Sequence, residues 1–368
     1  MKKNLFLLGL AVAAMTSCTN DEVVDVMQPT QKAIGFETFV NKGTRAVTET
    51  KNPTIENSAI TGLSKFHVFG YYTNSGTSKP VFTNQAVTGS VGYIDEAQTE
   101  EDIFWEYAST DADLKYWTQN PYMFAAYADQ NASSQIATTG NGATVGFEEG
   151  TLTFTNYTVS DNNDLVADVV AADNSNYEAY GNKVAFSFGH MLTKIYFKIQ
   201  NTDSKYRMIV TSPLTITGVK NQGTATIVEN GTISWTPTPS GTVRDNFVPG
   251  VAKEENITNN VFTKATGIWT SEEYLVMPQQ AISEITFSIE VNFIDENDQV
   301  VTTKTFTDKE FNVTTVDKWG CGLVYCYTIS LPTAAKPIEF DVTGVAGWRN
   351  YGNSIELNPS DDGTNGTN

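Results

Sequence analysis

The chain has 368 residues and a formal net charge of −19, with 42 acidic residues against 23 basic ones. This balance argues against binding to nucleic acid or to an anionic membrane face, because phosphate contacts require clustered Lys and Arg. Hydrophobic residues make up 40% of the chain, which excludes a disordered protein, and the length is typical of two domains. Aromatic residues make up 11%, and with plentiful Gly, Thr and Asn this favours a β-rich extracellular protein.

Residues 1–17 predict a lipoprotein signal peptide. Lys2 and Lys3 form a charged start, and residues 5–14 form a mostly apolar run. The run is too short to span a bilayer, since a spanning helix needs about 20 apolar residues. Cys18 follows directly, as in a lipoprotein box, where the thiol takes a diacylglycerol and becomes the mature N-terminus. We therefore expect lipidation at Cys18.

Residues 18–45 predict a lipidated propeptide that contains one removable strand. Apolar residues alternate with others over residues 33–40, as in a half-buried strand. The residues expected to face inward, and to be removed with the strand, are Ile34, Phe36 and Val40. The segment that follows suggests an exposed loop in which Arg45 precedes the small residue Ala46. A single loop Arg is usually only solvated, so the residues alone favour proteolytic processing at Arg45 and Ala46 less than a surface role.

Residues 46–178 predict an N-terminal β-sandwich domain. No segment of convincing length has the helical period, and short strands alternate with turn residues, which is typical of a sandwich. The expected strands span residues 63–73, 122–128, 152–159 and 165–171, with a short aromatic segment at 102–108 and a lead into the second strand at 115–117. In the first of them Phe66, Val68 and Tyr72 share one face. An Asn-rich stretch at 174–182 indicates the domain boundary.

Residues 179–358 predict a C-terminal β-sandwich domain, followed by a polar tail at 359–368. The domain opens with residues 183–199, the expected strands that follow span residues 285–293, 300–306 and 323–331, and 336–342 and 345–348 are expected to form a final strand pair. Ile195, Phe197 and Ile199 should point inward, whereas Lys194, Tyr196 and Lys198 should point outward. Residues 295–299 predict a hairpin turn. Both halves are expected to be antiparallel sandwiches.

Cys321 and Cys326 are predicted to be unpaired, packed cysteines. Five residues along a strand place them on opposite faces and roughly 17 Å apart, whereas a disulfide needs Cα atoms within about 7 Å. They can pair only if the chain folds back at the glycines beside Cys321. A metal site is less favoured still, because no His or other Cys lies near them.

Motifs for catalysis are absent, so we expect no enzymatic activity, no cofactor and no metal. His67 lies on an alternating strand and His190 in a Gly-His-Met turn, and both suit a packed or surface role. Residues 140–146 lack the spacing of a phosphate loop and predict a hairpin loop. Asp295, Asn297 and Asp298 lack the remainder of a calcium loop. Asp168 and Asp173 have the residue type of paired glycosidase carboxylates, although nothing in the sequence selects them.

The chain resembles the fimbrillin family, the type V pilins and pilin-like lipoproteins that bacteria export, lipidate and then mature by proteolysis. The segments that carry the resemblance are the Cys18 box, residues 33–40 before 44–46, 66–72, 116–117, 188–195, 319–331, 338–340 and 347–348. The resemblance covers nearly the whole chain. It implies two transthyretin-like Greek-key β-sandwich domains, a location at the outer membrane and in the surface fimbrium, and cleavage behind an Arg that matches Arg45. Asp21 and Glu22 resemble the acidic signal for surface export of lipoproteins.

A mechanism of assembly follows from counting strands. Removal of residues 33–45 should leave an open sheet edge and an apolar groove, and an unpaired edge is a template for an incoming strand. A strand from the next subunit, within residues 336–348, is expected to fill it. The donor residues are expected to be Ile338, Phe340, Val342, Val345 and Trp348. Because a groove then contacts a different surface of the next copy, the contact is heterologous and propagates into a filament.

Three other roles remain open at this stage. The chain fits a lipid-retaining pilus anchor or a tip adhesin, and it fits a stand-alone lipoprotein that binds glycans through exposed Tyr and Trp. An enzymatic role is the least favoured of the three. The expected partners are other pilin subunits, the outer membrane through the lipid before processing, and a ligand on a host or bacterial surface.

Overall fold

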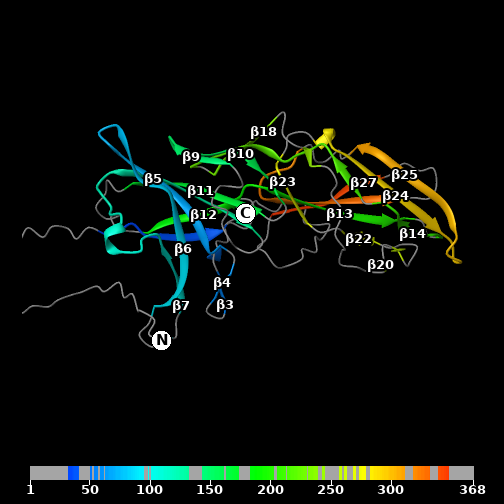
Figure 1. Cartoon of the computed structure of the whole chain (residues 1–368), viewed down its shortest axis with the longest axis horizontal. Coiled ribbons are helices and arrows are strands. Elements are labelled where there is room, and N and C mark those ends of the chain that lie inside the picture. The colour runs from blue at the N-terminus through cyan, green and yellow to red at the C-terminus, as the bar shows by residue number, and fades with distance from the viewer. Residues whose placement is uncertain are drawn as a thin grey trace, which may run out of the picture. The chain divides into compact units, whose positions relative to one another are not determined.

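The computed structural model describes residues 32–40, 50–51, 54–56, 59–61, 63–94, 98, 101–131, 143–160, 163–173, 183–202, 205–212, 214–229, 231–238, 243–244, 257–258, 261–262, 268–270, 273–278, 282–310, 318–331 and 339–347. In these ranges the chain forms β-strands and two short 3-10 turns, η1 (Asp111–Asp113) and η2 (Ile282–Glu284), which confirms the all-β class (Figure 1). Within the same ranges, no helix has the length and apolar character to cross a membrane.

The largest sheet has eight strands and contains the N-terminal strand. Its order is β2 (Thr50–Lys51), β1 (Phe36–Val40), β12 (Val184–His190), β11 (Asn163–Asp173), β8 (Pro121–Asn131), β5 (Lys65–Asn74), β6 (Thr77–Tyr93) and β7 (Glu101–Glu106). On the central strand β8, Phe124 and Ala126 belong to one buried cluster, while Ala125 and Tyr127 belong to another. Both faces of this strand are buried, which explains why its sequence is almost continuously apolar.

A four-stranded sheet covers one face of the large sheet. Its order is β18 (Ile233–Pro237), β17 (Gln222–Val228), β10 (Thr151–Thr158) and β9 (Thr144–Glu148). Leu152, Phe154 and Tyr157 on β10 pack with Tyr127 of β8 in one core cluster. The Phe66 face of the large sheet encloses a second cluster, to which Phe66, Val68 and the partly buried Tyr72 contribute as predicted.

Two further sheets form the C-terminal sandwich. The first contains β22 (Ile268–Thr270), β13 (Thr193–Asn201), β26 (Leu323–Leu331) and β27 (Glu339–Gly347) in that order, with β23 (Tyr274–Val276) also paired to β13. The second contains β15 (Thr215–Thr217), β24 (Thr286–Ile294), β14 (Arg207–Val210), β21 (Val261–Phe262) and β20 (Ile257–Thr258), with β25 (Val300–Glu310) paired to β24. Ile195, Phe197 and Ile199 lie in the core between them, as predicted.

Two small two-stranded sheets complete the described structure. One pairs β16 (Val219–Lys220) with β19 (Val243–Arg244), and the other pairs β3 (Thr54–Glu56) with β4 (Ala59–Thr61).

Three sequence predictions about the strands are wrong. The sheets are not purely antiparallel, because β1 pairs in parallel with β12, and β13 pairs in parallel with β26. Tyr196 is not exposed; only 6% of its surface is accessible, because it packs with Cys326 in the core that β10 also lines. The expected pair of strands at residues 336–342 and 345–348 is one strand, β27, which absorbs an extra residue as a bulge opposite Cys326 and Tyr327.

Strand pairing crosses the predicted domain boundary between residues 178 and 179. β12 pairs with β11 and β1, and β17 pairs with β10, although both β12 and β17 follow that boundary in the sequence. The boundary therefore stays a prediction about folding units and does not divide the sheets.

Candidate functional site

The candidate site consists of β1, the strand that precedes Arg45, and the segments that flank it. β1 runs parallel to β12, with Phe36 opposite Val184 and Val40 opposite Phe188. The residues just before β1 also form backbone hydrogen bonds with residues 115–117. Ile34 donates its N–H to the Lys115 carbonyl at 2.8 Å, and the Trp117 N–H donates to the Lys32 carbonyl at 3.1 Å. The strand therefore lies inside the sheet structure, with hydrogen-bonded neighbours on two sides.

The side chains before and within β1 enter the core, as the alternation predicts. Ile34 and Phe36 are each 2% exposed, and Thr38 is 4% exposed. The ring of Phe36 contacts four aromatic rings from four other segments, at centroid distances of 5.5–6.0 Å; they belong to Phe66, Phe82, Tyr107 and Phe186. Val40 is placed by its backbone pairing alone. Phe36 thus anchors β1 in the core through its ring contacts.

Residues 41–49 link β1 to β2, and the two strands are antiparallel neighbours, with Val40 opposite Thr50. Arg45 and Ala46 fall in this linking segment and lie outside the described residues, as does Cys18. A cut between residues 45 and 46 severs the covalent connection between β1 and everything that follows it. Afterwards β1 is retained only by its noncovalent contacts, and the high effective concentration of a tethered strand is lost.

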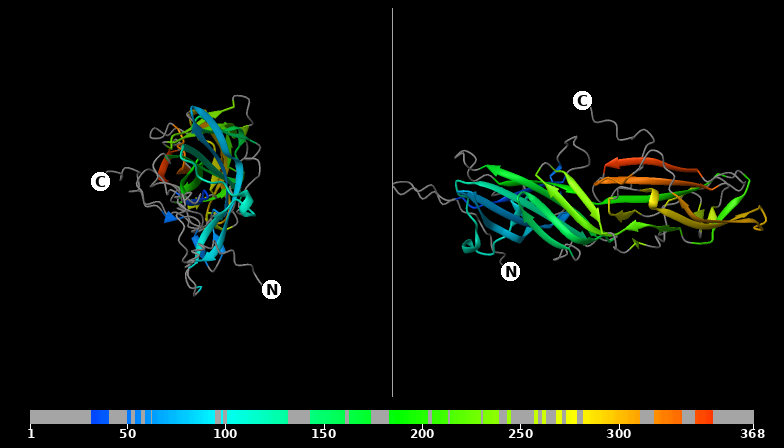
Figure 2. Two further views of the ribbon diagram at one scale, coloured as in Figure 1. Left: turned by 90° about the vertical axis from the view of Figure 1, so that its left-hand side faces the viewer. Right: turned by 90° about the horizontal axis from the view of Figure 1, so that it is seen from above.

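β27, which contains most of the predicted donor residues, is the outer strand beside β26, as the red and orange strands in Figure 2 show. Phe340 lies opposite Ile329 in the register, Val342 opposite Tyr327, and Val345 opposite Tyr325. Ile338 and Trp348 lie outside the described residues. Among the described strands β27 pairs with β26 alone, so leaving the sheet would break one described ladder of hydrogen bonds.

Asp168 on β11 marks the point at which β12 separates from β11. The two strands pair only at Val166 with His190 and at Ala167 with Gly189. Beyond this, the Asp168 carboxylate accepts the N–H of Ser187 at 2.7 Å and replaces the missing strand carbonyl. Burial raises the pKa of Asp168 to about 6, although the hydrogen bonds from Ser187 and Val169 act in the opposite direction. β12 is therefore bonded mainly to β1.

The remaining candidate residues have structural roles. His67 stacks on Tyr127 at 5.3 Å, with its Nδ1 atom 3.2 Å from the Asn84 carbonyl, and His190 is 9% exposed. Both histidines are packed, as expected. Neither Cys321 nor Cys326 forms a disulfide, as predicted, and burial raises the pKa of the Cys321 thiol to about 12.

The acidic candidates do not form a site. Asp295 accepts the N–H groups of Asn297 and Gln299 and caps the predicted hairpin turn, which lowers its pKa. Asp298 bonds Arg207. Asp168 and Asp173 lie on one strand, opposite Ala126 and Pro121. Their odd spacing assigns them to opposite faces, so they are not a carboxylate pair. The described residues contain no group of His, Cys, Asp or Glu that could hold a metal ion.

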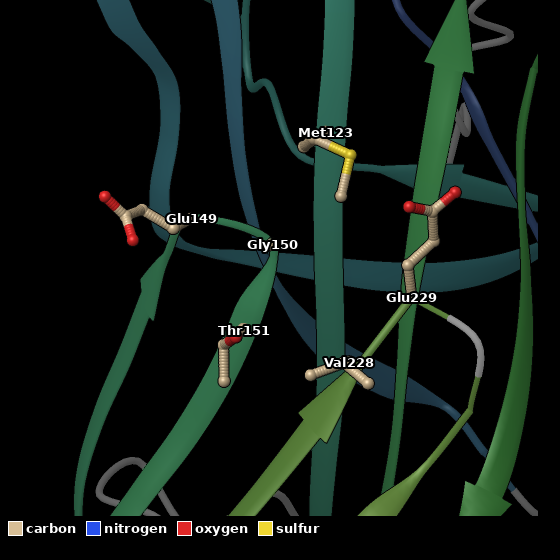
Figure 3. A pocket seen from close by; sticks show the side chains of 6 residues that line it. All are labelled: Met123, Glu149, Gly150, Thr151, Val228 and Glu229. Atoms are coloured by element: carbon tan, nitrogen blue, oxygen red, sulfur yellow. The ribbon is translucent and has the colours of Figure 1, made fainter.

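An open pocket of about 410 Å³ lies where the β9–β10 and β17–β18 turns approach β8. It is lined by Met123, Glu149, Gly150, Thr151, Val228 and Glu229. The Glu149 side chain points away from the other labelled side chains, so the two carboxylates do not converge on one point (Figure 3). This arrangement provides no acid–base pair for glycoside hydrolysis.

Sequence reasoning missed the walls of the β1 site. Phe186 and Phe188 on β12 and the backbone at Lys115 and Trp117 flank β1, yet they lie far from it in the sequence. One signal was present, because residues 184–188 alternate large apolar residues with smaller ones, as residues 34–40 do. Alternation reports burial but not the neighbouring strand or its direction, so the parallel pairing could not be read from it.

A family model described as fimbrillin-like matches residues 44–348 of this chain. Among solved structures, a fimbrial protein from Bacteroides vulgatus is similar, with a TM-score of 0.52 and 18% sequence identity, and the match covers 86% of this chain and 100% of that one. The fimbrial anchor protein Mfa2 from Porphyromonas gingivalis matches with a TM-score of 0.32 and 8% identity, over 86% of this chain and 98% of that one. At such identities the likeness concerns the fold, and only the first match supports it. No curated protein sequence matches the chain.

Proposed function

Because the chain belongs to the fimbrillin-like family, we propose that it is a structural subunit of a cell-surface pilus, exported as a lipoprotein, processed after Arg45 and polymerised by donor-strand exchange. The family is one of structural proteins, and the chain is not an enzyme. The observation that carries the proposal is the position of β1, which lies buried within the sheet and is joined covalently to the strands that follow it through residues 41–49.

Removal of β1 creates a strong acceptor. The backbone of β12 loses its partner over Val184–Phe188, and the groups at Lys115 and Trp117 lose theirs. Buried backbone groups without partners are costly, so the edge favours any strand that can bond it. The aromatic wall around the Phe36 position is uncovered at the same time, and each large side chain that returns to such a site contributes about 1.5–3 kcal/mol.

The sequence of the proposed donor matches that of the strand it would replace. Residues 34–38 read Ile-Gly-Phe-Glu-Thr, and residues 338–342 read Ile-Glu-Phe-Asp-Val. Ile and Phe recur with the same spacing, and Val342 corresponds to the buried Thr38. A donor placed with Phe340 at the Phe36 position would present an apolar residue at each of these three inward positions.

Exchange of this kind produces a filament. The acceptor is the vacated β1 site of one subunit, and the donor is β27 of the next, so the two surfaces of the contact differ. A heterologous contact leaves one free acceptor and one free donor after every addition, and growth therefore continues. Before the cut, the acceptor is filled by a strand of the same chain, which keeps the precursor monomeric.

Lipidation at Cys18 would hold the precursor at the outer membrane until processing. N-terminal sequencing of filaments sheared from cells tests the proposal: a stalk subunit begins at Ala46. Recovery of a mature chain that begins at the lipid-modified Cys18 would instead assign the anchor or stand-alone lipoprotein role. Labelling with a fatty-acid analogue should mark the wild type and not Cys18→Ala, and label that persists in that variant would exclude Cys18 as the acceptor.

A further inference from the structure

A second sheet edge is open, and it lies at the opposite end of the strand order from β2. β7 is the last strand of the eight-stranded sheet, and among the described strands it pairs only with β6 (Figure 1). β1 and β3 both come near β7, but β1 pairs with β2 and β12, and β3 pairs with β4. Thr88 of β6 lies opposite both Lys65 of β5 and Glu106 of β7. After Thr88, the only described strand that pairs with β6 is β7. Two strands alone are marginally stable, so this ribbon would gain from a third.

The backbone groups that point outward from β7 can be identified. Gly89 donates its N–H to Ser64, towards β5, so its neighbour Ser90 faces β7. Ser90 lies opposite Phe104, and the backbone groups of Phe104 therefore face β6. By alternation, those of Ile103 and Trp105 point away from the sheet. The Ile103 N–H donates to the carboxylate of its neighbour Asp102, at 2.8 Å.

The edge strand β25 is protected, whereas β7 is regular. β25 carries Lys304 and Lys309, its register with β24 shifts twice, and Asp308 adopts a φ of 48°. Lysines and bulges are the usual devices that prevent an edge from pairing. β7 pairs with β6 over six consecutive residues without a register shift and contains no Lys.

Apolar side chains gather beside this edge. Phe104 is 37% exposed and lies over Gly92, while Tyr93 and Ile94 at the end of β6 are 47% and 58% exposed. Trp105, on the other face, packs on Phe66 at 5.0 Å. Asp102, Phe104 and Glu106 therefore share the outer face, and Ile103 and Trp105 the inner one.

The negative charge of β7 determines which kind of segment its outer edge can bind. The six residues of β7 include three acidic residues and no Lys or Arg. Two copies of β7 paired with each other would bring the carboxylates of Asp102 and Glu106 from both chains together, and like charges across a strand pair are destabilising. We propose that the outer edge of β7 binds an extended basic segment of another protein as an added strand. Basic residues of that segment lie beside Asp102 and Glu106, alternating with apolar residues beside Ile103 and Trp105.

The probe for this site is a fluorescein-labelled peptide of five Lys-Val repeats, and its binding to the full-length chain is measured by fluorescence anisotropy. A block peptide of the same composition, five Lys followed by five Val, has the same charge but cannot separate its side chains onto two faces. Ile103→Pro removes the outward N–H without removing a bond to β6, and Pro is tolerated at such edge positions. Glu106→Lys reverses an exposed charge on β7, and Glu310→Lys makes the same change on β25.

We expect the alternating peptide to bind at least about tenfold more tightly than the block peptide. Ile103→Pro and Glu106→Lys should each lower the affinity for the alternating peptide about tenfold, because each removes a group that the bound strand pairs with. Glu310→Lys should bind like the wild type. Equal binding of both peptides, or undiminished binding by Ile103→Pro and Glu106→Lys, would overturn the proposal. A dimer of the free chain that Ile103→Pro abolishes in sedimentation would overturn it too, because the occupant would then be a second copy.

Discussion

The ring of Phe36 on β1 stacks on the ring of Phe186 on β12, with centroids 5.8 Å apart and an interplanar angle of 25°. This contact joins the strand proposed to be removed to the strand proposed to receive its replacement. Phe186 is fully buried, and it also contacts Phe66 and Phe188. The same aromatic wall therefore stabilises the precursor and defines what a donor strand must supply.

Phe36→Ala should destabilise the uncleaved chain by about 3–5 kcal/mol, because it removes a large side chain from a packed aromatic core. Urea denaturation gives the free energy of unfolding. Glu37→Ala, on the same strand but only half-buried, is the matched control and should change stability by much less. A Phe36→Ala variant as stable as this control would show that β1 is not anchored by its aromatic contacts.

Tyr327→Phe should destabilise the C-terminal sandwich by about 1–3 kcal/mol, because it leaves a buried donor without its acceptor. The Trp319 indole N–H donates to the Tyr327 hydroxyl at 2.6 Å, and both side chains are buried. Thermal unfolding monitored by Trp fluorescence measures the loss. Tyr116→Phe, at a 39% exposed side chain, should be close to neutral, and equal effects of the two substitutions would contradict the assignment.

Asp168 should make stability fall as the pH rises from about 4 to about 6. Its pKa is raised to about 6 in the folded chain from an ordinary value of 3.8, so the folded state binds more protons than the unfolded state in this window. The loss of stability caused by the ionised Asp168 carboxylate is absent below about pH 4 and complete above about pH 6. Asp168→Asn keeps an acceptor for Ser187 and should be more stable than the wild type at pH 7 by about 1–3 kcal/mol, but not at pH 4.

Unfolding midpoints of both proteins across this pH range check the prediction. Asp111→Asn, at an exposed side chain on η1, serves as the control and should follow the wild-type profile. A constant difference between Asp168→Asn and the wild type from pH 4 to pH 7 would exclude titration of Asp168 as its cause.

Cys321 and Cys326 should resist alkylation in the native chain. Burial raises the pKa of the Cys321 thiol to about 12, and Cys326 is 1% exposed. Since the thiolate is the reactive form, iodoacetamide at pH 8 should label both residues slowly before unfolding and rapidly afterwards. Mass spectrometry of the labelled peptides gives both rates, and fast labelling of the native chain would contradict the packing.

Alternation in the sequence predicted individual strands well and their neighbours poorly. Residues 323–331 form β26 with the predicted bounds, and the apolar residues of 285–293 line the C-terminal core on β24. These strands face one core each, so a period of two is visible. The prediction that Tyr196 points outward was wrong because β13 is buried on both faces at that point. The two strands expected at 336–342 and 345–348 are one strand because the chain passes residue 343 as a bulge in β27.

The candidate site was predicted in part for the same reason. The burial of Ile34 and Phe36 follows from their spacing, and the structure agrees. The strand that accepts them, β12, is separated from β1 by more than a hundred residues, and no local pattern specifies a parallel partner at such a distance. The bonds from Lys115 and Trp117 depend on how the sheet curls, which is a property of the whole fold.

The proposed exchange is tested most directly by light scattering of the purified chain before and after cleavage with an Arg-specific protease, with N-terminal sequencing to establish the cut behind Arg45. Uncut protein should remain monomeric, and cut protein should form polymers, because the groove around the Phe36 position is then open to the next subunit. Lys42→Ala, which changes the other basic residue of the linking segment, should polymerise like the wild type, whereas Arg45→Ala should stay monomeric. If Arg45→Ala polymerises as readily as the wild type, β1 does not control assembly.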